Sequence, residues 1–247
     1  MRVSLMQPYF FPYLGYFDLI NCSDRWIVFD TAQYIKQGWV NRNRVLHTQQ
    51  GWEYIIVPVK KHPHNTAIGD VEISDDRPWR QKIMRQLMHY QKQAPYYRQV
   101  VDLVGACLAS QETHISKLNV RILDIICSYL GIPFRYQFLS DMGLDLGQDL
   151  GPGEWGLQVS IALGASEYVN APGGRALFDE QAFKRAGVML NIRNVPPMQY
   201  ACGRYQFEPH LSIIDVMMWN DGPSIKRYLD IQRAAASDSN TAGQHAA

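Results

Sequence analysis

The sequence lacks both a metal-binding pattern of cysteines and a dominant charge. Its four cysteines form no CxxC pair and have no nearby histidine at zinc-finger spacing, so we expect no metal site. The 24 Lys and Arg residues are balanced by 23 Asp and Glu residues, which gives a net charge of +1. Proteins that coat nucleic acid carry a clear excess of basic residues, so we do not expect nucleic-acid binding.

Long apolar segments and targeting signals are also missing. No apolar run approaches the ~18 residues that a membrane-spanning helix needs. The N-terminus has no basic segment followed by an apolar stretch, so no secretory signal is predicted. We therefore expect a protein without a membrane span in a reducing, cytoplasmic setting. Buried, reduced thiols are expected at Cys107 and Cys127, which lie among apolar residues.

Common catalytic and nucleotide-binding signatures are absent from the chain. It contains no GxGxxG, GxxxxGK[ST], HExxH or GxSxG pattern. No cofactor can be assigned from the sequence for this reason. A functional site has to be sought in less standard clusters of polar and aromatic residues.

Short strand patterns alternate with helical patterns in the first and last parts of the chain. Apolar runs of strand length, bounded by turn residues, predict strands at 3–7, 26–29, 134–139, 167–170 and 188–192. Helical patterns between them predict helices at 14–20, 155–163 and 179–186. Such alternation is typical of parallel βαβ pairing.

Two further patterns complete the predicted fold. Segments 41–47 and 53–59 flank a Gly-containing loop of hairpin length, and helical stripes follow at 79–92, 99–109 and 115–129. The fold class is therefore α/β: a Rossmann-like, mostly parallel sheet with a β-hairpin and a helical insertion around 79–130. We expect a single domain over 1–232. The tail 233–247 is small and polar without periodicity, and we expect it to be disordered.

An aromatic segment directly follows the first predicted strand. It begins at Gln7, and six of the ten residues 8–17 are aromatic. Open α/β sheets bind ligands beyond the carboxyl ends of their strands, so Tyr9, Tyr13 and Tyr16 could stack on a base or a sugar ring. The alternative is that these rings form core or a partner interface.

Two segments offer candidate catalytic groups. Asp30 ends an apolar strand, close to Gln33, where a carboxylate can meet a ligand hydroxyl or a proton in transit, although Asp also commonly caps a turn. His62 follows another strand, near Lys60, and could act as a general base near neutral pH. For His62 a plain loop remains the alternative, and a metal interpretation of the HxH pattern lacks a third ligand.

Strong hydrogen-bond donors alternate in the first strand of the hairpin. Asn41 and Asn43 lie on one face and Arg42 and Arg44 on the other. Arginine makes bidentate contacts with phosphate or carboxylate, so we favour anion binding. A solvated edge strand whose charges prevent aggregation is the alternative.

A glycine pair follows the strand at 167–170. The segment contains Asn170, Gly173 and Gly174, and a helix is predicted shortly after it. Backbone amides there could converge on an anion at a helix N-terminus, or the glycines could only shape a tight turn. Further along, Ser212 and Asp215 resemble a capping box at a helix start, for which a structural role is expected.

These clusters together resemble the WbqC-like family. The resemblance runs in order over roughly residues 1–230 and is most specific in the first block. It rests on Met6 to Phe17, Asp30 with Gln33 and Tyr34, Trp39 to Arg44, Val57 to Val59, Tyr168 to Asn170 with Gly173 and Gly174, and Leu211 to Asp215. Two departures stand out: helix 155–163 lacks the basic residues often seen there, and Phe178 replaces a usual Tyr.

The resemblance implies a pathway more firmly than a reaction. WbqC-like proteins are encoded among genes for O-antigen and other surface polysaccharides, so we expect an enzyme of cell-surface polysaccharide biosynthesis. The expected reaction is group transfer, acyl or aminoacyl, on a nucleotide-activated sugar or amino sugar, or a related small anionic substrate. The alternative is a non-catalytic module that binds a glycan or a partner of the same pathway.

Overall fold

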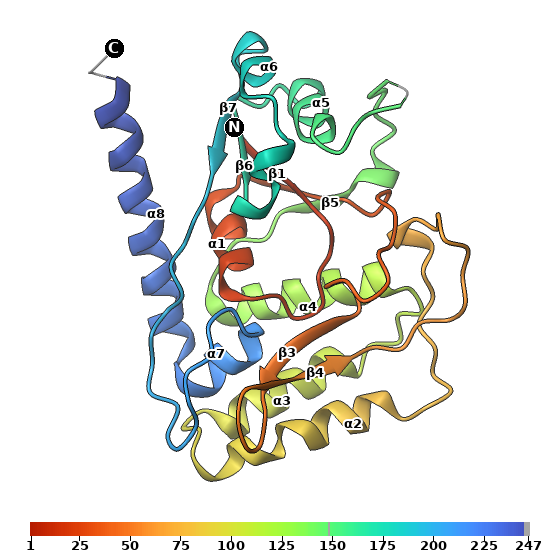
Figure 1. Cartoon of the computed structure of the whole chain (residues 1–247), viewed down its shortest axis with the longest axis vertical. Helices are drawn as coiled ribbons and strands as arrows, with labels where there is room; N and C mark the ends of the chain where they lie inside the picture. Colours follow the sequence, from red (N-terminus) through yellow and green to blue (C-terminus); the bar gives the residue numbers. More distant parts are fainter. Residues whose placement is uncertain (148, 245–247) are drawn as a thin grey trace.

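Five short segments of the chain pair side by side as parallel strands. The computed structural model describes residues 1–147 and 149–244, with side chains described up to residue 235. The strands are β1 (Arg2–Met6), β2 (Arg25–Val28), β5 (Tyr136–Phe138), β6 (Glu167–Asn170) and β7 (Met189–Ile192). They lie in the order β5-β2-β1-β6-β7, and every neighbouring pair is parallel (Figure 1).

This strand order is that of a Rossmann-like sheet. The chain starts in the middle at β1, moves outward through β2 to β5, and then returns to place β6 on the other side of β1. The order therefore reverses between β1 and β6. In open α/β sheets the connections leave in opposite directions at such a point, and a crevice forms beyond the carboxyl ends of the strands. The predicted fold class is confirmed.

Both faces of the sheet are covered by helices because the strand side chains alternate. In β2, Trp26 and Val28 join a larger core cluster, and Ile27 joins a smaller one on the opposite face. Helices α1 (Leu14–Cys22) and α8 (Gly222–Gln244) lie on the larger side, and α5 (Glu154–Ala162) and α6 (Glu180–Arg185) cover the smaller side (Figure 1).

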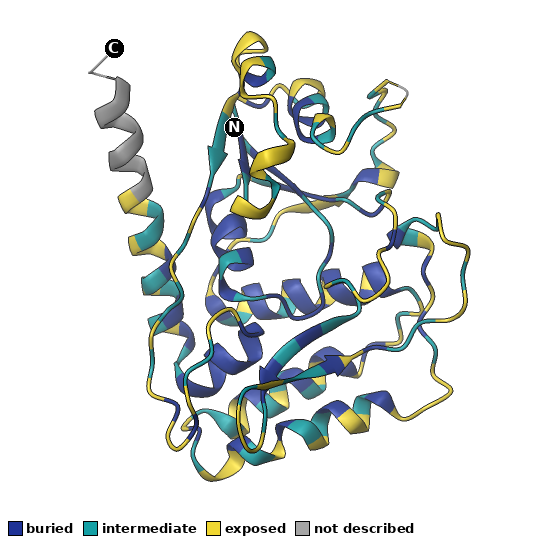
Figure 2. Ribbon diagram, in the orientation of Figure 1, coloured by how far each residue is buried: buried dark blue, intermediate teal, exposed yellow. Residues whose placement is uncertain are grey.

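The larger core also contains the hairpin and the helices between β4 and β5. Strands β3 (Arg42–Leu46) and β4 (Trp52–Ile56) form the predicted antiparallel pair. The helices that follow are α2 (Trp79–Gln86), α3 (Tyr97–Leu108) and α4 (Ile115–Leu130). Figure 2 shows α4 largely buried, whereas α2 exposes its outward side. The helix predicted over 79–92 changes at Leu87 into the 3-10 helix η2 (Leu87–Lys92).

The capping box predicted around Ser212 forms only in part. Ser212 does cap α7 (Ile213–Trp219), since its hydroxyl accepts from the backbone N–H of Ile214 at 3.2 Å. The carboxylate of Asp215 does not complete the box. It accepts instead from the hydroxyls of Tyr90 and Tyr200, at 2.6 Å each.

Helix α8 is the main element that the sequence analysis did not assign. Its apolar residues Ile225 and Leu229 are fully buried at helical spacing. The helix continues to Gln244, into the segment 233–247 for which we expect disorder. The side chains of 236–244 and all of residues 245–247 lie outside the described residues, so disorder of the tail stays a prediction, as does a single domain over 1–232. No described helix is long and apolar enough to cross a membrane.

Candidate functional site

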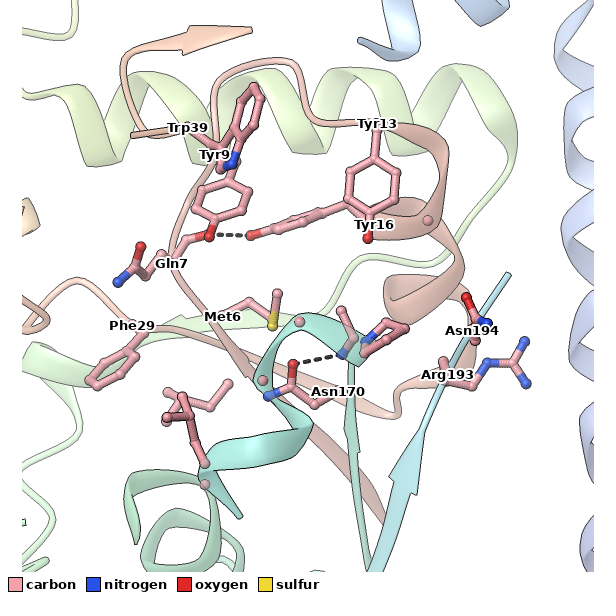
Figure 3. Close-up of a pocket in the computed structure, with 18 of the residues that line it drawn as sticks. Met6, Gln7, Tyr9, Tyr13, Tyr16, Phe29, Trp39, Asn170, Arg193 and Asn194 are labelled. Carbon is pink, nitrogen blue, oxygen red and sulfur yellow. Dashed lines mark hydrogen bonds between the residues drawn. The ribbon is translucent and has the colours of Figure 1, made fainter. Parts of the chain in front are cut away.

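A cavity of about 610 Å³ opens where the strand order of the sheet reverses. Its floor comes from the ends of three strands: Met6 ends β1 and Gln7 follows it, Asn170 ends β6, and Arg193 follows β7. Figure 3 shows these residues around the cavity, with the aromatic segment on the opposite side. The cavity therefore lies where the topology of an open α/β sheet places a ligand.

Three tyrosines of the N-terminal segment line one side of the cavity. The rings of Tyr9 and Tyr16 lie 5.5 Å apart, and the Tyr16 hydroxyl donates to the carbonyl of Gln7 at 2.5 Å (Figure 3). Tyr13 precedes α1 and packs edge-on against His210. Burial raises the pKa of all three hydroxyls, so these side chains are neutral donors and stacking surfaces.

The aromatic segment is held in an unusual backbone conformation. Phe11 is buried at φ 40, a left-handed conformation that non-glycine residues rarely adopt. Two side chains fix the carbonyls around it: Asn43 Nδ2 donates to Phe10 O at 3.0 Å and Ser212 Oγ donates to Phe11 O at 2.8 Å. Asn43 lines the cavity as predicted, but its amide also holds this loop in place.

Arg44 brings a cationic group to the edge of the cavity. Its guanidinium lies 5.4 Å from the ring of Trp39 and 5.0 Å from that of Trp52, and Nη2 donates to His210 O at 3.1 Å. Among the described residues no carboxylate pairs with it. A guanidinium within cation–π distance of two indoles and without a carboxylate partner among the described residues is suited to an anionic ligand.

Two neighbours in the hairpin face elsewhere. Arg42 lies 4.1 Å from the ring of Tyr54 and donates to Gln37 O, and it does not line the cavity. Asn41 donates to Val57 O at 3.0 Å and ties the two hairpin strands together. Of the four hairpin residues predicted to bind substrate, the structure brings Asn43 and Arg44 to this cavity.

The glycine pair forms the other rim of the cavity. Gly173 and Gly174 lie in the 3-10 helix η4 (Pro172–Leu177), which follows β6. The N–H of Gly174 donates to Ala171 O at 3.3 Å, so this amide serves the turn itself. The side chain of Asn170 accepts from the N–H of Ala171 at 2.6 Å, which fixes the start of the rim (Figure 3).

Arg193 is a residue of the cavity wall that the sequence analysis missed. Its Nε and Nη2 each donate to the carboxylate of Asp18, at 2.8 Å, and both side chains are almost fully buried. Burial opposes the charge of Arg193, but the hydrogen bonds and charge of Asp18 outweigh it, so the pKa of Arg193 is raised. In Figure 3 the guanidinium points away from Asn170. Its hydrogen bonds to Asp18 connect the end of β7 to α1.

The charge of the cavity lining is one-sided. Among the described residues no Asp or Glu side chain lines it, and its polar groups are arginines, amides, tyrosine hydroxyls, indole N–H groups and one imidazole. That imidazole belongs to His210, an exposed residue at φ 57 that no sequence pattern singled out. The amides of Gln7, Asn170 and Asn194 add donors and acceptors without charge. The cavity therefore favours a neutral or anionic ligand with polar groups.

The predicted catalytic residue Asp30 lies outside this cavity. Its carboxylate accepts from the backbone N–H of Ser140 at 3.1 Å and from the Ser140 hydroxyl at 2.5 Å, which joins the ends of β2 and β5. Asp30 lines a second cavity instead. Gln33, predicted to bind substrate, is exposed and donates to the carbonyl of His64 at 2.8 Å.

His62 and Lys60 also lie away from this cavity, which we call the switch-point cavity because it opens where the strand order of the sheet reverses. His62 donates from Nδ1 to Pro63 O at 2.9 Å, and its ring meets Tyr34 edge-on at 5.0 Å between centroids. Lys60 forms an exposed ion pair with Glu72 at 2.5 Å. The structure thus places neither predicted catalytic group beside the tyrosines, Arg44 and the glycine pair.

Fold and site define an α/β protein with a doubly wound parallel sheet and a ligand-sized cavity at its switch point. A sequence model of the WbqC-like protein family matches residues 7–227, and the chain belongs to this family. A curated relative, "Uncharacterized protein Rv1507c" of Mycobacterium tuberculosis (strain ATCC 25618 / H37Rv), is 33% identical over 231 residues, covering 92% of this chain and 97% of the relative. No solved structure gives a significant match.

Proposed function

We propose that the chain is a cytoplasmic enzyme of cell-surface polysaccharide biosynthesis that binds a nucleotide-linked sugar in the switch-point cavity. The observation that carries this proposal is that Arg44, which forms no ion pair, lines a cavity without a carboxylate among the described residues. Its volume of about 610 Å³ falls within the range of small-molecule sites. Family membership supports the pathway.

The cavity lining offers a suitable side chain for each chemical part of such a ligand. The phosphates would lie near Arg44, which lines the cavity and has no carboxylate partner among the described residues. A sugar or base ring would stack on Tyr9 or Tyr13, which are half-buried at the cavity wall. Amides such as that of Gln7 can bond to hydroxyls in either direction, as donor or acceptor.

The proposed reaction is transfer of an acyl or aminoacyl group to an amine or hydroxyl of the bound sugar. The attacking nitrogen or oxygen forms a bond to the acyl carbon of an ester or thioester, and the bond from that carbon to its carrier breaks. The proton of the attacking group passes to a base. The roles predicted for Asp30 and His62 stay predictions, and His210 is the imidazole that lines the cavity.

Thermal-shift and calorimetric titrations with UDP- and dTDP-amino sugars test the binding step. We expect a rise in melting temperature at millimolar ligand, and at least tenfold weaker binding in Arg44→Ala, because a charge-assisted hydrogen bond contributes about 1.5–3 kcal/mol. Arg42→Ala is the matched control, since Arg42 also stacks on an aromatic ring of the hairpin but does not line the cavity. No shift with any nucleotide sugar, or equal losses in both variants, would contradict the proposal.

A non-catalytic glycan- or partner-binding module is the second candidate. The observation that favours it is the position of Asp30 and His62 outside the cavity. It predicts that cells carrying Asp30→Asn or His62→Ala still produce the polysaccharide, whereas Tyr13→Ala abolishes production. Loss of production in the first two variants, with protein levels unchanged, would favour the enzyme.

A further inference from the structure

A second cavity, of about 640 Å³, opens at the same edge of the sheet beyond β2 and β5. Phe29 and Asp30 are consecutive residues at the end of β2, and Phe29 lines the switch-point cavity whereas Asp30 lines the second one. The remaining walls come from the segment around the 3-10 helix η1 (Ile68–Asp70), from α4 and the residues just before it, and from β5 and the residues that follow it.

The charge of this second cavity is opposite to that of the first. Its lining contains the carboxylates of Asp30, Asp70, Glu112, Asp124 and Asp141. Against them stand two cations, Lys117 and Arg121, and the imidazole of His114. None of the five carboxylates forms an ion pair within the described part of the chain. The cavity therefore holds an excess of unmatched negative charge.

Ser116 supplies an independent sign of a missing partner. The residue is only 2% exposed and lines the cavity, yet its hydroxyl has no hydrogen-bond partner among the described residues. The Ser116 oxygen is not among the fully buried polar atoms that lack a partner, so a group in the cavity can reach it. An unpaired hydroxyl can donate one hydrogen bond and accept others. A ligand group in the cavity that bonds to the Ser116 hydroxyl would provide what the protein does not.

The arrangement of the acids favours an organic cation. In the described part of the chain no three His, Cys, Asp or Glu side chains are grouped closely enough to hold a metal ion. An ammonium group carries three N–H donors and can reach separated carboxylates and a hydroxyl at once. We propose that the second cavity binds a primary ammonium group, as carried by an amino acid or an aminoacyl ester.

The place of this cation in a reaction rests on the proposed function. Because both cavities open at one edge of the sheet, and the consecutive residues Phe29 and Asp30 line one cavity each, an anionic sugar substrate and an amine-bearing co-substrate would lie near each other. Of the two transfers proposed above, the ammonium site selects the aminoacyl one, since a plain acyl group carries no positive charge. The binding of the cation itself does not depend on that role.

NMR titration with glycinamide tests the cation site on the full chain. We expect glycinamide to shift the backbone amide signals of residues 112–124 and 140–141. N-acetylglycinamide, which lacks the charge, should bind at least tenfold more weakly. Asp124→Asn and Ser116→Ala should each weaken glycinamide at least threefold. Both remove cavity-lining groups, and Asp124 is exposed, so its replacement leaves the core intact. Asp102→Asn, on exposed α3 surface outside the cavity, is the matched control.

Three results would overturn the ammonium site: equal shifts with glycinamide and N-acetylglycinamide, shifts that map elsewhere, or equal effects of Asp124→Asn and Asp102→Asn. The titration contains no nucleotide, so its outcome is independent of the switch-point cavity. Binding of glycinamide without binding of any nucleotide sugar would defeat the proposed function alone. The reverse pattern would defeat the ammonium site alone.

Discussion

Asp215 is a carboxylate almost completely removed from water, and it makes folding depend on pH. Burial raises its pKa to about 6 from an ordinary 3.8, although hydrogen bonds from Tyr200 and Tyr90 favour the charged form. Below pH 3.8 the folded and unfolded chains both hold the proton, and the stabilising contribution is complete. As pH rises towards 6 the unfolded chain ionises first, so stability falls until both states are charged.

We therefore predict that the free energy of unfolding falls by about 1 kcal/mol between pH 5 and pH 7 on account of Asp215 alone. Asp215→Asn, which cannot ionise, should lack this component while keeping a side chain of the same shape. Urea unfolding of both proteins at the two pH values measures the difference. Parallel pH profiles for wild type and variant would show that Asp215 is not the source.

Two glycines near the switch-point cavity have opposite tolerance for a side chain. A Cβ at Gly156 of α5 would lie 2.4 Å from Cζ of Tyr168 in β6, whereas a Cβ at Gly173 would meet nothing within 4 Å. Gly156→Ala should destabilise the protein by about 2 kcal/mol through overpacking. Gly173→Ala should change stability by less than about 0.5 kcal/mol. Chemical denaturation distinguishes them, and equal effects would show that the α5–β6 contact can relax.

At the scale of elements, the buried pair of Asp18 and Arg193 joins α1 to the end of β7. The sheet places β7 at its edge, so this pair fixes an outer strand against a helix on the larger core side. Removing one partner of a buried pair leaves an uncompensated charge, so Asp18→Asn should lower the free energy of unfolding by about 3–5 kcal/mol.

Asp24→Asn is the control for this prediction. Asp24 pairs with Arg2 at 2.7 Å, but both side chains are partly exposed, and an exposed pair contributes about 0–1 kcal/mol. Equilibrium unfolding in urea measures both losses. Similar small losses in the two variants would mean that water reaches Arg193 once Asp18 is neutral.

The elements themselves were largely predictable, and the exceptions have physical reasons. Strand β6 was predicted at its observed bounds because an apolar pair is closed on both sides by polar residues. Helix α8 was missed although Ile225 and Leu229 carry its apolar spacing, because the small polar tail that follows has no periodicity. The change to 3-10 geometry at η2 could not be predicted, because the apolar residues of 79–92 keep the spacing of an α-helix across Leu87.

The site was predictable where it depends on strand ends and not where it depends on strand order. Gln7 follows β1 and Asn170 ends β6, and these strands prove to be neighbours, so both residues reach the switch-point cavity. Asp30 also follows a strand, but β2 lies one position farther out in the sheet, and Asp30 lines the second cavity instead. His210 comes from a loop brought in by tertiary contacts, such as the one between its carbonyl and Arg44, which no local pattern reveals.

At the scale of the whole molecule, one edge of the sheet presents two cavities of opposite electrostatic character. In the part of the chain that the structure describes, the cavity beyond β1 and β6 is lined by Arg44 and by no carboxylate, and the one beyond β2 and β5 by five carboxylates. A net charge of +1 therefore conceals a marked separation of charge at this edge. Two ligands of opposite charge would be sorted between the cavities before any contact with catalytic groups.

This separation predicts that the two ligands stabilise the whole chain additively. A ligand present at 100 times its Kd raises the free energy of unfolding by about 2.7 kcal/mol, and one at ten times its Kd by about 1.4 kcal/mol. We take a nucleotide amino sugar at about 100 times its Kd and glycinamide at about ten times its Kd. The increase in the free energy of unfolding with both ligands should then equal the sum of the two single increases within about 0.5 kcal/mol. Urea unfolding with each ligand and with both measures it. A joint increase no larger than the greater single one would mean that the ligands compete for one site, and the assignment of one cavity to each charge would fail.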